Sequence, residues 1–457
     1  CKRELLTPIP QTSVTDATAF DTPDRILGQV NSLYAALKNG NFYGGRYIVY
    51  GDIRGEDFIN ETTNLVTGSD VWSLNCAGTS QNSVKNLWSQ AYYTINLCNL
   101  FNDGMAAKGA TVVPAATANN YVAESRLIRA LSYYSLLQFY ARPYADGNGS
   151  KPGVPLRLTG IKGSGFSDLA RSTVAQVYTQ ILADLDFAET NLPLTNATAE
   201  LNTTRANRNT AIALKTRVYL TMGNYAAVIT EGNKIASQSA APFKALTGVA
   251  DSLQPNIATV FTTYNTTESI FSLPMTSTGG DNPGTQNPLG FYWVRNGSSL
   301  GSAEYSLNAA TGIIANANWT ATDARKTALV YTNAGTGKKF VSKFPGASPY
   351  TDYVPVIRYS EVLLNLAEAL ANVNGLDTKS IALLNAVRGR SDATTIFKPT
   401  DKADLLSKII NERRIEFFGE GIRNSDIMRL GLPIPAKTPV GSTPVPATNP
   451  TDGNYIW

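Results

Sequence analysis

The sequence predicts a mainly α-helical protein whose helices are interrupted by long irregular insertions. Two observations lead to this fold class. Apolar residues recur at spacings of three, four and seven along many segments, whereas few stretches alternate between apolar and polar residues as strands do. Stretches without any period, rich in glycine, asparagine, threonine and serine, separate these segments. We therefore expect the helices to form a scaffold and the insertions to form an irregular binding face.

The helical segments fall into pairs joined by tight turns. The clearest pair lies in residues 211–236, where one helix ends near Gly223 and the next begins at Tyr225. A late pair occupies residues 358–390, with Gly375 between its helices. The second span is one repeat period long, which is typical of a tetratricopeptide-like unit.

Two further pairs form only if insertions are allowed between their helices. These pairs are residues 24–38 with 84–102, and residues 120–141 with 173–190. We expect four helix pairs in one domain over residues 1–457. Its helical scaffold covers about 20–240 and 356–432, and its insertions cover about 40–80, 143–170 and 240–355.

The composition excludes several classes of function. The net charge is only +4 and basic residues are scattered among acidic ones, so no basic track for nucleic acid exists. No run of about 18 apolar residues is present that could span a bilayer. Histidine is absent, which removes Ser-His-Asp and Cys-His nucleophiles and every histidine-ligated metal site. We expect no nucleic-acid partner, no cofactor and no metal site.

The three cysteines suggest a secreted, lipid-anchored chain. Cys1 stands first, as it does in a mature bacterial lipoprotein whose thiol carries diacylglycerol, so we expect lipidation there. Cys76 and Cys98 lie 22 positions apart, and a disulfide between them is one alternative. The other is that Cys98 is a small buried thiol within a helix.

The stretch "NERRIEFFGEGIRNSDIMRL" (residues 411–430) concentrates charge in a chain that is only 16% charged. Arg413 and Arg414 continue apolar ladders at four-residue spacing, so their guanidinium groups should lie on or beside a buried face. We expect Glu412, Glu416 and Glu420 to pair with them. Arginine neighbours lower the pKa of a carboxyl group, which is unfavourable for a general acid. The stretch is therefore interpreted as scaffold.

The same stretch, with "AESRLIRALSYYSLLQFYARP" (residues 123–143), "YTQILADLDFAETNLP" (178–193) and "IRYSEVLLNLAEAL" (357–370), resembles the SusD/RagB family of Bacteroidetes outer-membrane lipoproteins. The resemblance implies a SusD-like fold. It also implies a lipid-anchored binding protein that faces the cell exterior and covers a SusC-like TonB-dependent barrel. Members of the family are not enzymes. The best-known ones bind oligosaccharides on aromatic platforms, and others bind peptides.

Two insertions carry the side chains that sugar binding requires, namely flat aromatic rings and polar groups for hydroxyls. The first insertion contains "SDVWSLN", where polar neighbours suggest an exposed tryptophan. The second contains "GFYWVRN" and "ANANW". The predicted ligand-binding residues are Trp72, Asn75, Asp52, Arg54, Tyr292, Trp293, Arg295 and Trp319.

Three alternatives to oligosaccharide capture stay open. One is a peptide-binding lipoprotein of the RagB type. Another is a glycoside hydrolase, for which Asp52 and Glu56 are the nearest pair of carboxylates, although Arg54 lies between them. The third is a tetratricopeptide adaptor, against which Cys1 and the aromatic insertions argue.

Overall fold

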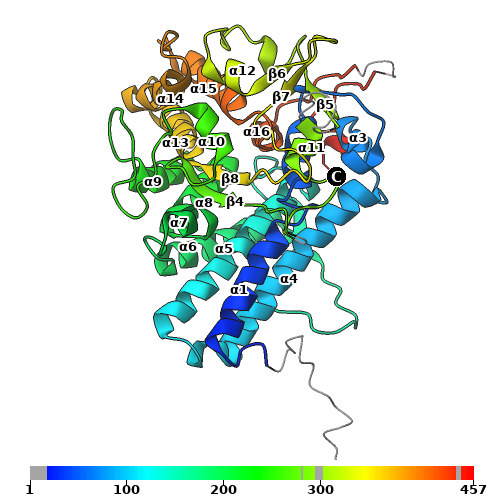
Figure 1. Cartoon of the computed structure of the whole chain (residues 1–457), viewed down its shortest axis with the longest axis vertical. Helices are drawn as coiled ribbons and strands as arrows, with labels where there is room; N and C mark the ends of the chain where they lie inside the picture. Colours follow the sequence, from blue (N-terminus) through cyan, green and yellow to red (C-terminus); the bar gives the residue numbers. More distant parts are fainter. Residues whose placement is uncertain (1–17, 279–280, 294–301, 439–443, 457) are drawn as a thin grey trace, which may run out of the picture.

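The predicted helices occur at nearly the predicted positions in the computed structural model, which describes residues 18–278, 281–293, 302–438 and 444–456 (Figure 1). The scaffold helices are α1 (Pro23–Leu37), α4 (Asn86–Ala107), α5 (Ala115–Tyr140), α6 (Val174–Asn191), α8 (Arg208–Thr221), α9 (Tyr225–Ile235), α13 (Tyr359–Asn374), α14 (Thr378–Ser391), α15 (Lys402–Phe417) and α16 (Arg423–Leu430). None of the described helices is long and apolar enough to cross a bilayer.

The four predicted helix pairs pack as pairs. Helix α1 contacts α4, α5 contacts α6, α8 contacts α9, and α13 contacts α14. The pairs also contact one another, because α4 packs on α5, α6 on α8, and α9 on α13. The mainly helical fold class is confirmed, while the likeness of each pair to a tetratricopeptide unit stays a prediction.

Local chemistry accounts for where these helices begin and end. A capping box starts α6, in which Thr173 and Gln176 each satisfy the other's backbone N–H. The turns within the two tight pairs contain Gly223 and Gly375, with φ of +71° and +77°. Glycine adopts this left-handed conformation without steric cost, so the turns lie where the sequence predicts them.

The insertions contain short elements rather than a second large core. The first holds α2 (Arg46–Ile53), β1 (Phe58–Asn60) and α3 (Ser69–Trp72), and the second β2 (Pro152–Pro155) and β3 (Arg171–Thr173). The third holds α10 (Ile257–Thr262), β4 (Ser269–Leu273), α11 (Leu289–Trp293), β5 (Tyr305–Leu307), α12 (Ala324–Ala328), β6 (Val330–Thr332), β7 (Lys339–Val341) and β8 (Val354–Arg358). Helix α7 (Ala199–Thr204) precedes α8.

Among the described residues the strands form two-stranded antiparallel sheets, and two of these sheets join segments that are far apart in the chain. Strand β1 pairs with β5, with Phe58 opposite Leu307, which joins the first insertion to the third. The other pairs are β2 with β3, β4 with β8, and β6 with β7. In Figure 1, α3, α11, α12 and β5 to β7 gather at the upper end of the molecule, opposite the lower ends of α1, α4 and α5.

The two internal cysteines are free thiols. Cys98 is buried on α4, as one alternative from the sequence proposed, and Cys76 is partly buried. Burial raises the pKa of both thiols to about 12, so both stay protonated near neutral pH. The structure therefore contains no disulfide between them.

Candidate functional site

The predicted aromatic platform is not on the surface. Trp72 is 1% exposed, and its indole N–H donates a 2.8 Å hydrogen bond to the backbone carbonyl of Phe58. Trp293 is buried with its ring 4.7 Å from that of Phe58, and Trp319 is buried with its ring 5.0 Å from that of Phe418. A ring that stacks on a sugar must offer an open face. The expectation that these three rings are exposed is therefore wrong.

The polar residues predicted beside these rings are also mostly buried. Arg54 is 0% exposed, and Asp52 accepts hydrogen bonds from the backbone N–H groups of Gly421, just before α16, and Arg423, its first residue. Tyr292 is buried and donates to a backbone carbonyl at 2.8 Å. Of the described members of this group, Asn75 alone is exposed. Arg295 lies outside the described residues.

The C-terminal segment, meaning the described residues after Gly431, covers Arg54 and Trp72. The Lys437 ammonium donates to the backbone carbonyls of Arg54 and Trp72, each at 2.8 Å, and lies 5.2 Å from the centre of the Trp72 ring. The Arg54 guanidinium donates to the carbonyl of Tyr455 at 2.6 Å. A segment more than 360 positions away in the chain thus covers the first insertion.

Asp52 and Glu56, the pair considered for glycoside hydrolysis, have pKa values shifted in opposite directions, as hydrolysis requires, but no room for a sugar lies beside them. Burial raises the pKa of Asp52 to about 7. Burial would also raise the pKa of Glu56, but Arg423 and Arg414 outweigh it and lower that pKa. The cavity beside Asp52 has only about 10 Å³, too little for a sugar and an attacking water. The geometry gives the hydrolase alternative no support.

The charged stretch forms buried ion pairs, as predicted, but Arg413 and Arg414 pair with aspartates on other elements. Arg413 on α15 donates to Asp426 on α16 at 3.1 and 3.2 Å and to Asn365 on α13 at 2.6 Å. Arg414 pairs with Asp57 of the first insertion. The expected pairing of these arginines with glutamates of their own helix is wrong, because the guanidinium groups point across the helix interface rather than along it.

Glu416 is the centre of the largest cluster. It accepts hydrogen bonds from Arg325 at 2.8 Å, Arg358 at 2.9 Å and Arg390 at 2.6 Å, three residues from three different elements. Such a cluster connects α15 to the third insertion, to β8 and to α14. Its residues act as scaffold in this structure.

The predicted direction of the pKa shifts holds for only part of the stretch. Burial would raise the pKa of Glu416, but the charges of Arg390 and its neighbours outweigh burial and hold the pKa well below its usual range. For Glu412, burial dominates over Arg325 and Arg388, and its pKa is raised. The difference arises because desolvation opposes the charged form even where arginines are close.

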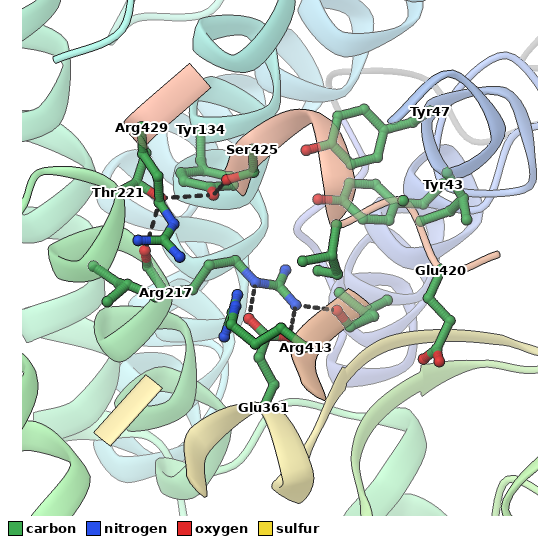
Figure 2. Close-up of a pocket in the computed structure, with 15 residues that line it drawn as sticks. Tyr43, Tyr47, Tyr134, Arg217, Thr221, Glu361, Arg413, Glu420, Ser425 and Arg429 are labelled. Carbon is green, nitrogen blue, oxygen red and sulfur yellow. Dashed lines mark hydrogen bonds and ion pairs between the residues drawn. The ribbon is translucent and has the colours of Figure 1, made fainter. Parts of the chain in front are cut away.

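Figure 2 shows a polar cavity whose lining includes Arg413 and Glu420 of the charged stretch. Arg217 reaches Glu361 through two hydrogen bonds of 2.7 Å, and the Tyr134 hydroxyl lies between those of Thr221 and Ser425 at 3.0 and 3.1 Å. The cavity has about 20 Å³, which accommodates about one water molecule. It is too small for a saccharide.

An open cavity on α4 has the size and the side chains that a sugar ring needs. Its volume is about 220 Å³. That is less than the roughly 300 to 1,000 Å³ of pockets that enclose a drug-sized ligand, and it suits one ring of a longer chain. The lining residues are Trp88, Tyr92, Ile95, Asn96 and Asn99 from α4, and Pro155, Arg157 and Ile161 from β2 and the segment that follows it.

Two aromatic rings form one side of this α4 cavity. Trp88 and Tyr92 are both partly exposed, and their ring centres are 4.8 Å apart at an angle of 46°. Trp88 also packs edge-on against Tyr140, at 5.0 Å. The rings are therefore held in place while part of their surface stays accessible.

Hydrogen bonds fix the opposite side, which is the segment of residues 155–161. Asn96 donates to the carbonyl of Ile161 at 3.1 Å and accepts from its N–H at 2.8 Å. Tyr92 donates to the carbonyl of Pro155 at 2.8 Å, and Asn99 donates to that of Arg157 at 3.1 Å. Burial raises the pKa of Tyr92, and the nearby Arg157 charge lowers it only in part. The cavity is thus preformed, and its tyrosine is neutral.

The sequence contains a weak signal for the α4 cavity that our sequence analysis missed. Trp88, Tyr92 and Asn96 stand at four-residue spacing in "NLWSQAYYTINLCN" and so share one face of a helix. That spacing is also typical of a core face. Only the position of residues 155–161 shows that this face borders an open cavity.

A second open cavity, of about 370 Å³, lies between α10 and α12. Its charged lining residue is Lys343, whose ammonium donates to the carbonyl of Glu416 and to the carboxylate of Glu420 at 2.7 and 2.6 Å. Phe261 and Tyr331 also line it, and the Lys343 ammonium lies 4.8 Å from the centre of the Phe261 ring. Within the described ranges, no cluster of three or more cysteines or carboxylates is arranged to hold a metal ion.

The sequence model of the SusD family matches residues 81–451, and the chain belongs to this family. A solved SusD superfamily protein from Bacteroides fragilis is 33% identical, covers 96% of each chain and superposes with a TM-score of 0.81. The curated "SusD-like protein P2" of Formosa agariphila is 23% identical over 93% of this chain and 87% of its own length.

A third relative has the same fold at lower identity. The solved "Surface glycan-binding protein A" from Bacteroides fluxus is 21% identical, with a TM-score of 0.68 over 90% of this chain and 89% of its own. At this identity the likeness establishes the fold alone.

Proposed function

We propose that this protein is a single SusD-like domain, lipid-anchored at the outer membrane and facing the cell exterior, that captures oligosaccharides and passes them to a SusC-like TonB-dependent transporter. Family membership supports the general role, and a relative named as a surface glycan-binding protein supports the ligand class. The α4 cavity is the site that we propose for capture.

The observation that best supports this proposal is the partly exposed aromatic pair, Trp88 and Tyr92, on one side of that cavity. The CH-rich face of a pyranose packs favourably on an aromatic ring. Because hydrogen bonds already hold the opposite side, little ordering cost accompanies binding. The cavity takes one ring, and the adjoining sugars of an oligosaccharide would extend over the surface.

Binding rather than hydrolysis fits this site, since no carboxylate is among the residues that line it. Incubation of the protein with oligosaccharides should release no new reducing ends. Release of reducing ends that follows the protein through purification would favour the hydrolase alternative.

The test of capture is calorimetric binding of an oligosaccharide panel and a peptide pool, side by side. With the best oligosaccharide, Trp88→Ala should weaken binding at least about tenfold, or 1.4 kcal/mol. Tyr93→Ala is the matched control, because Tyr93 is 56% exposed on the same helix but does not line the cavity. Trp88→Phe should bind nearly normally, since it keeps a ring.

Two results would contradict the proposal. If Trp88→Ala binds oligosaccharides normally with an unchanged melting temperature, the site lies elsewhere. If peptides bind and no oligosaccharide does, the RagB-like alternative is correct.

Location and partner require separate measurements. Protease treatment of intact cells should remove the protein, and Cys1→Ala should release it from the membrane fraction. A SusC-like barrel should co-purify with the tagged wild-type protein from detergent-solubilised membranes. Protection from protease in intact cells would exclude the proposed orientation.

A further inference from the structure

Arg157 is the one charged residue among those that line the α4 cavity, and no aspartate or glutamate lines it. Arg157 is partly exposed. Within the described ranges, no hydrogen bond or ion pair engages its guanidinium group. An arginine presents five donors in a planar fork, so this group retains its full capacity to bind an oxyanion.

The backbone of Arg157 is held in place, although its guanidinium group has no partner among the residues that the structure describes. The Tyr133 hydroxyl donates to the Arg157 carbonyl at 2.7 Å and accepts from the Arg157 N–H at 2.7 Å. Asn99 donates to the same carbonyl at 3.1 Å. A fixed backbone limits the positions that the guanidinium group can reach, which favours a positioned charge over a loose surface arginine.

The other polar groups of the cavity are already engaged. Asn96 makes two hydrogen bonds to Ile161. Asn99 accepts from Arg129 at 2.8 Å, and Arg129 in turn forms a two-bond ion pair with Asp184 at 2.7 and 2.8 Å. Arg129 is thus neutralised beneath the cavity, whereas Arg157 is not. The positive charge that a ligand meets here is that of Arg157.

The nearest acidic side chain on the same helix does not change this balance. Asp103 accepts the backbone N–H of Gly160 at 2.8 Å and does not line the cavity. Lys162, which follows the cavity segment, is exposed and also does not line it. The cavity therefore combines two aromatic rings with one uncompensated positive charge.

We infer that the α4 cavity selects a sugar residue that carries an oxyanion, either the carboxylate of a uronic acid or a sulfate ester, with Arg157 as its charge partner and Trp88 and Tyr92 against the ring. The inference rests on the proposed function and adds the ligand class. Guanidinium and oxyanion form paired, charge-assisted hydrogen bonds, which a neutral hydroxyl does not replace.

The experiment compares oligosaccharides in matched charged and neutral forms. One pair is trigalacturonate and its carboxyl-reduced trisaccharide, and the other is a sulfated galactose oligosaccharide and its desulfated form. The wild-type protein should bind the charged member of at least one pair about tenfold tighter or more, and the preference should shrink as salt is raised. The pair that shows the preference identifies the carboxylate or the sulfate as the group recognised.

Two variants assign the preference to the cavity. Arg157→Gln should lose the preference, so that its affinities for the two members of the pair become equal. Lys162→Gln is the matched control, because it removes a nearby exposed charge and should keep the preference. Equal affinity of wild type for both members, or a preference that persists in Arg157→Gln, would overturn the inference.

The failure of this inference is distinguishable from that of the proposed function. Suppose that neutral oligosaccharides bind, that Trp88→Ala weakens their binding, and that the charged forms bind no tighter. The proposal of capture at the α4 cavity then stands, and the inference that the cavity selects an oxyanion is wrong. If no oligosaccharide of either form binds at the cavity, both proposals are wrong.

Discussion

Two groups of arginines in this protein have opposite surroundings. Arg413 and Arg358, on and beside α15, are buried and donate to carboxylates on other elements. Arg157, on the α4 cavity, is partly exposed, and the described structure gives its guanidinium group no partner. The same side chain thus occurs as a closed structural contact in one region and as an open donor in the other.

The comparison shows that burial and pairing, rather than the density of charge, separate scaffold from candidate site. A buried charge must be paired, because an isolated ion in a low-dielectric interior costs several kcal/mol. A partly exposed charge is solvated and can exchange water for a ligand. The conspicuous stretch of residues 411–430 is therefore structural, and the single arginine after β2 is the candidate for recognition.

The largest expected effect is a loss of stability when one of the buried, paired arginines is removed. Arg413→Ala removes one of the two arginine partners of the buried Asp426 and also the donor to Asn365, and breaking a buried ion pair typically costs about 3 to 5 kcal/mol of unfolding free energy. Urea unfolding followed by circular dichroism measures this loss. Oligosaccharide affinity of the folded fraction should not change. A normal melting temperature with abolished binding would move this stretch from scaffold to site.

Acid should reduce the stability that the ion pair between Arg413 and Asp426 contributes. Burial would raise the pKa of Asp426, but Arg413 and Arg429 outweigh it and lower that pKa. The contribution of this ion pair is therefore present above the ordinary aspartate pKa and is lost as the pH falls through the lowered one. Such a carboxylate typically contributes about 2.6 kcal/mol at neutral pH. Urea unfolding between pH 6 and 3 should show a smaller loss for Asp426→Asn than for wild type; equal slopes would contradict this.

Trp72 provides a sharper comparison with Trp88. Trp72→Phe removes the hydrogen bond to the Phe58 carbonyl and should cost about 1 to 3 kcal/mol of stability. It should leave oligosaccharide affinity unchanged, because Trp72 is buried beneath the C-terminal segment. Thermal melting and calorimetry on the same sample check both statements. If Trp72→Phe weakens oligosaccharide binding and leaves the melting temperature unchanged, Trp72 belongs to the binding site and this prediction is wrong.

The smallest expected effect on stability is that of substituting Arg157, the partly exposed arginine. Arg157→Gln should change the unfolding free energy by no more than about 0.5 kcal/mol, as surface substitutions without buried partners usually do. The measurement is urea unfolding beside Arg413→Ala. A loss of several kcal/mol would mean that Arg157 is a structural residue, and the contrast between the two regions would disappear.

The helical scaffold could be predicted from the sequence because its determinants are local. The tight turns at Gly223 and Gly375 and the apolar stripes of α13 and α14 depend on residues a few positions apart. The burial of Cys98 on α4 follows from the same periodicity. Helix ends needed only neighbouring caps, such as Thr173 on α6.

The candidate site could not be predicted in the same way. Polar neighbours made Trp72 look exposed, yet Asp70 beside it is itself buried and accepts a hydrogen bond from Ser83. The stripe of Trp88 and Tyr92 has the spacing that is also typical of a core face. The exposure of both segments depends on what packs against them, and no local pattern contains that information.

The sequence by itself determined which segments become helices, where they turn and which family the fold resembles, because periodicity, glycine and capping act over a few residues. Only the tertiary structure decided which aromatic faces stay open. Lys437 and the C-terminal segment cover Trp72 from more than 360 positions away, whereas the segment that ends at Ile161 stands beside Trp88 and leaves a cavity. Exposure is a property of what the rest of the chain places against a residue, and only folding brings those distant segments together.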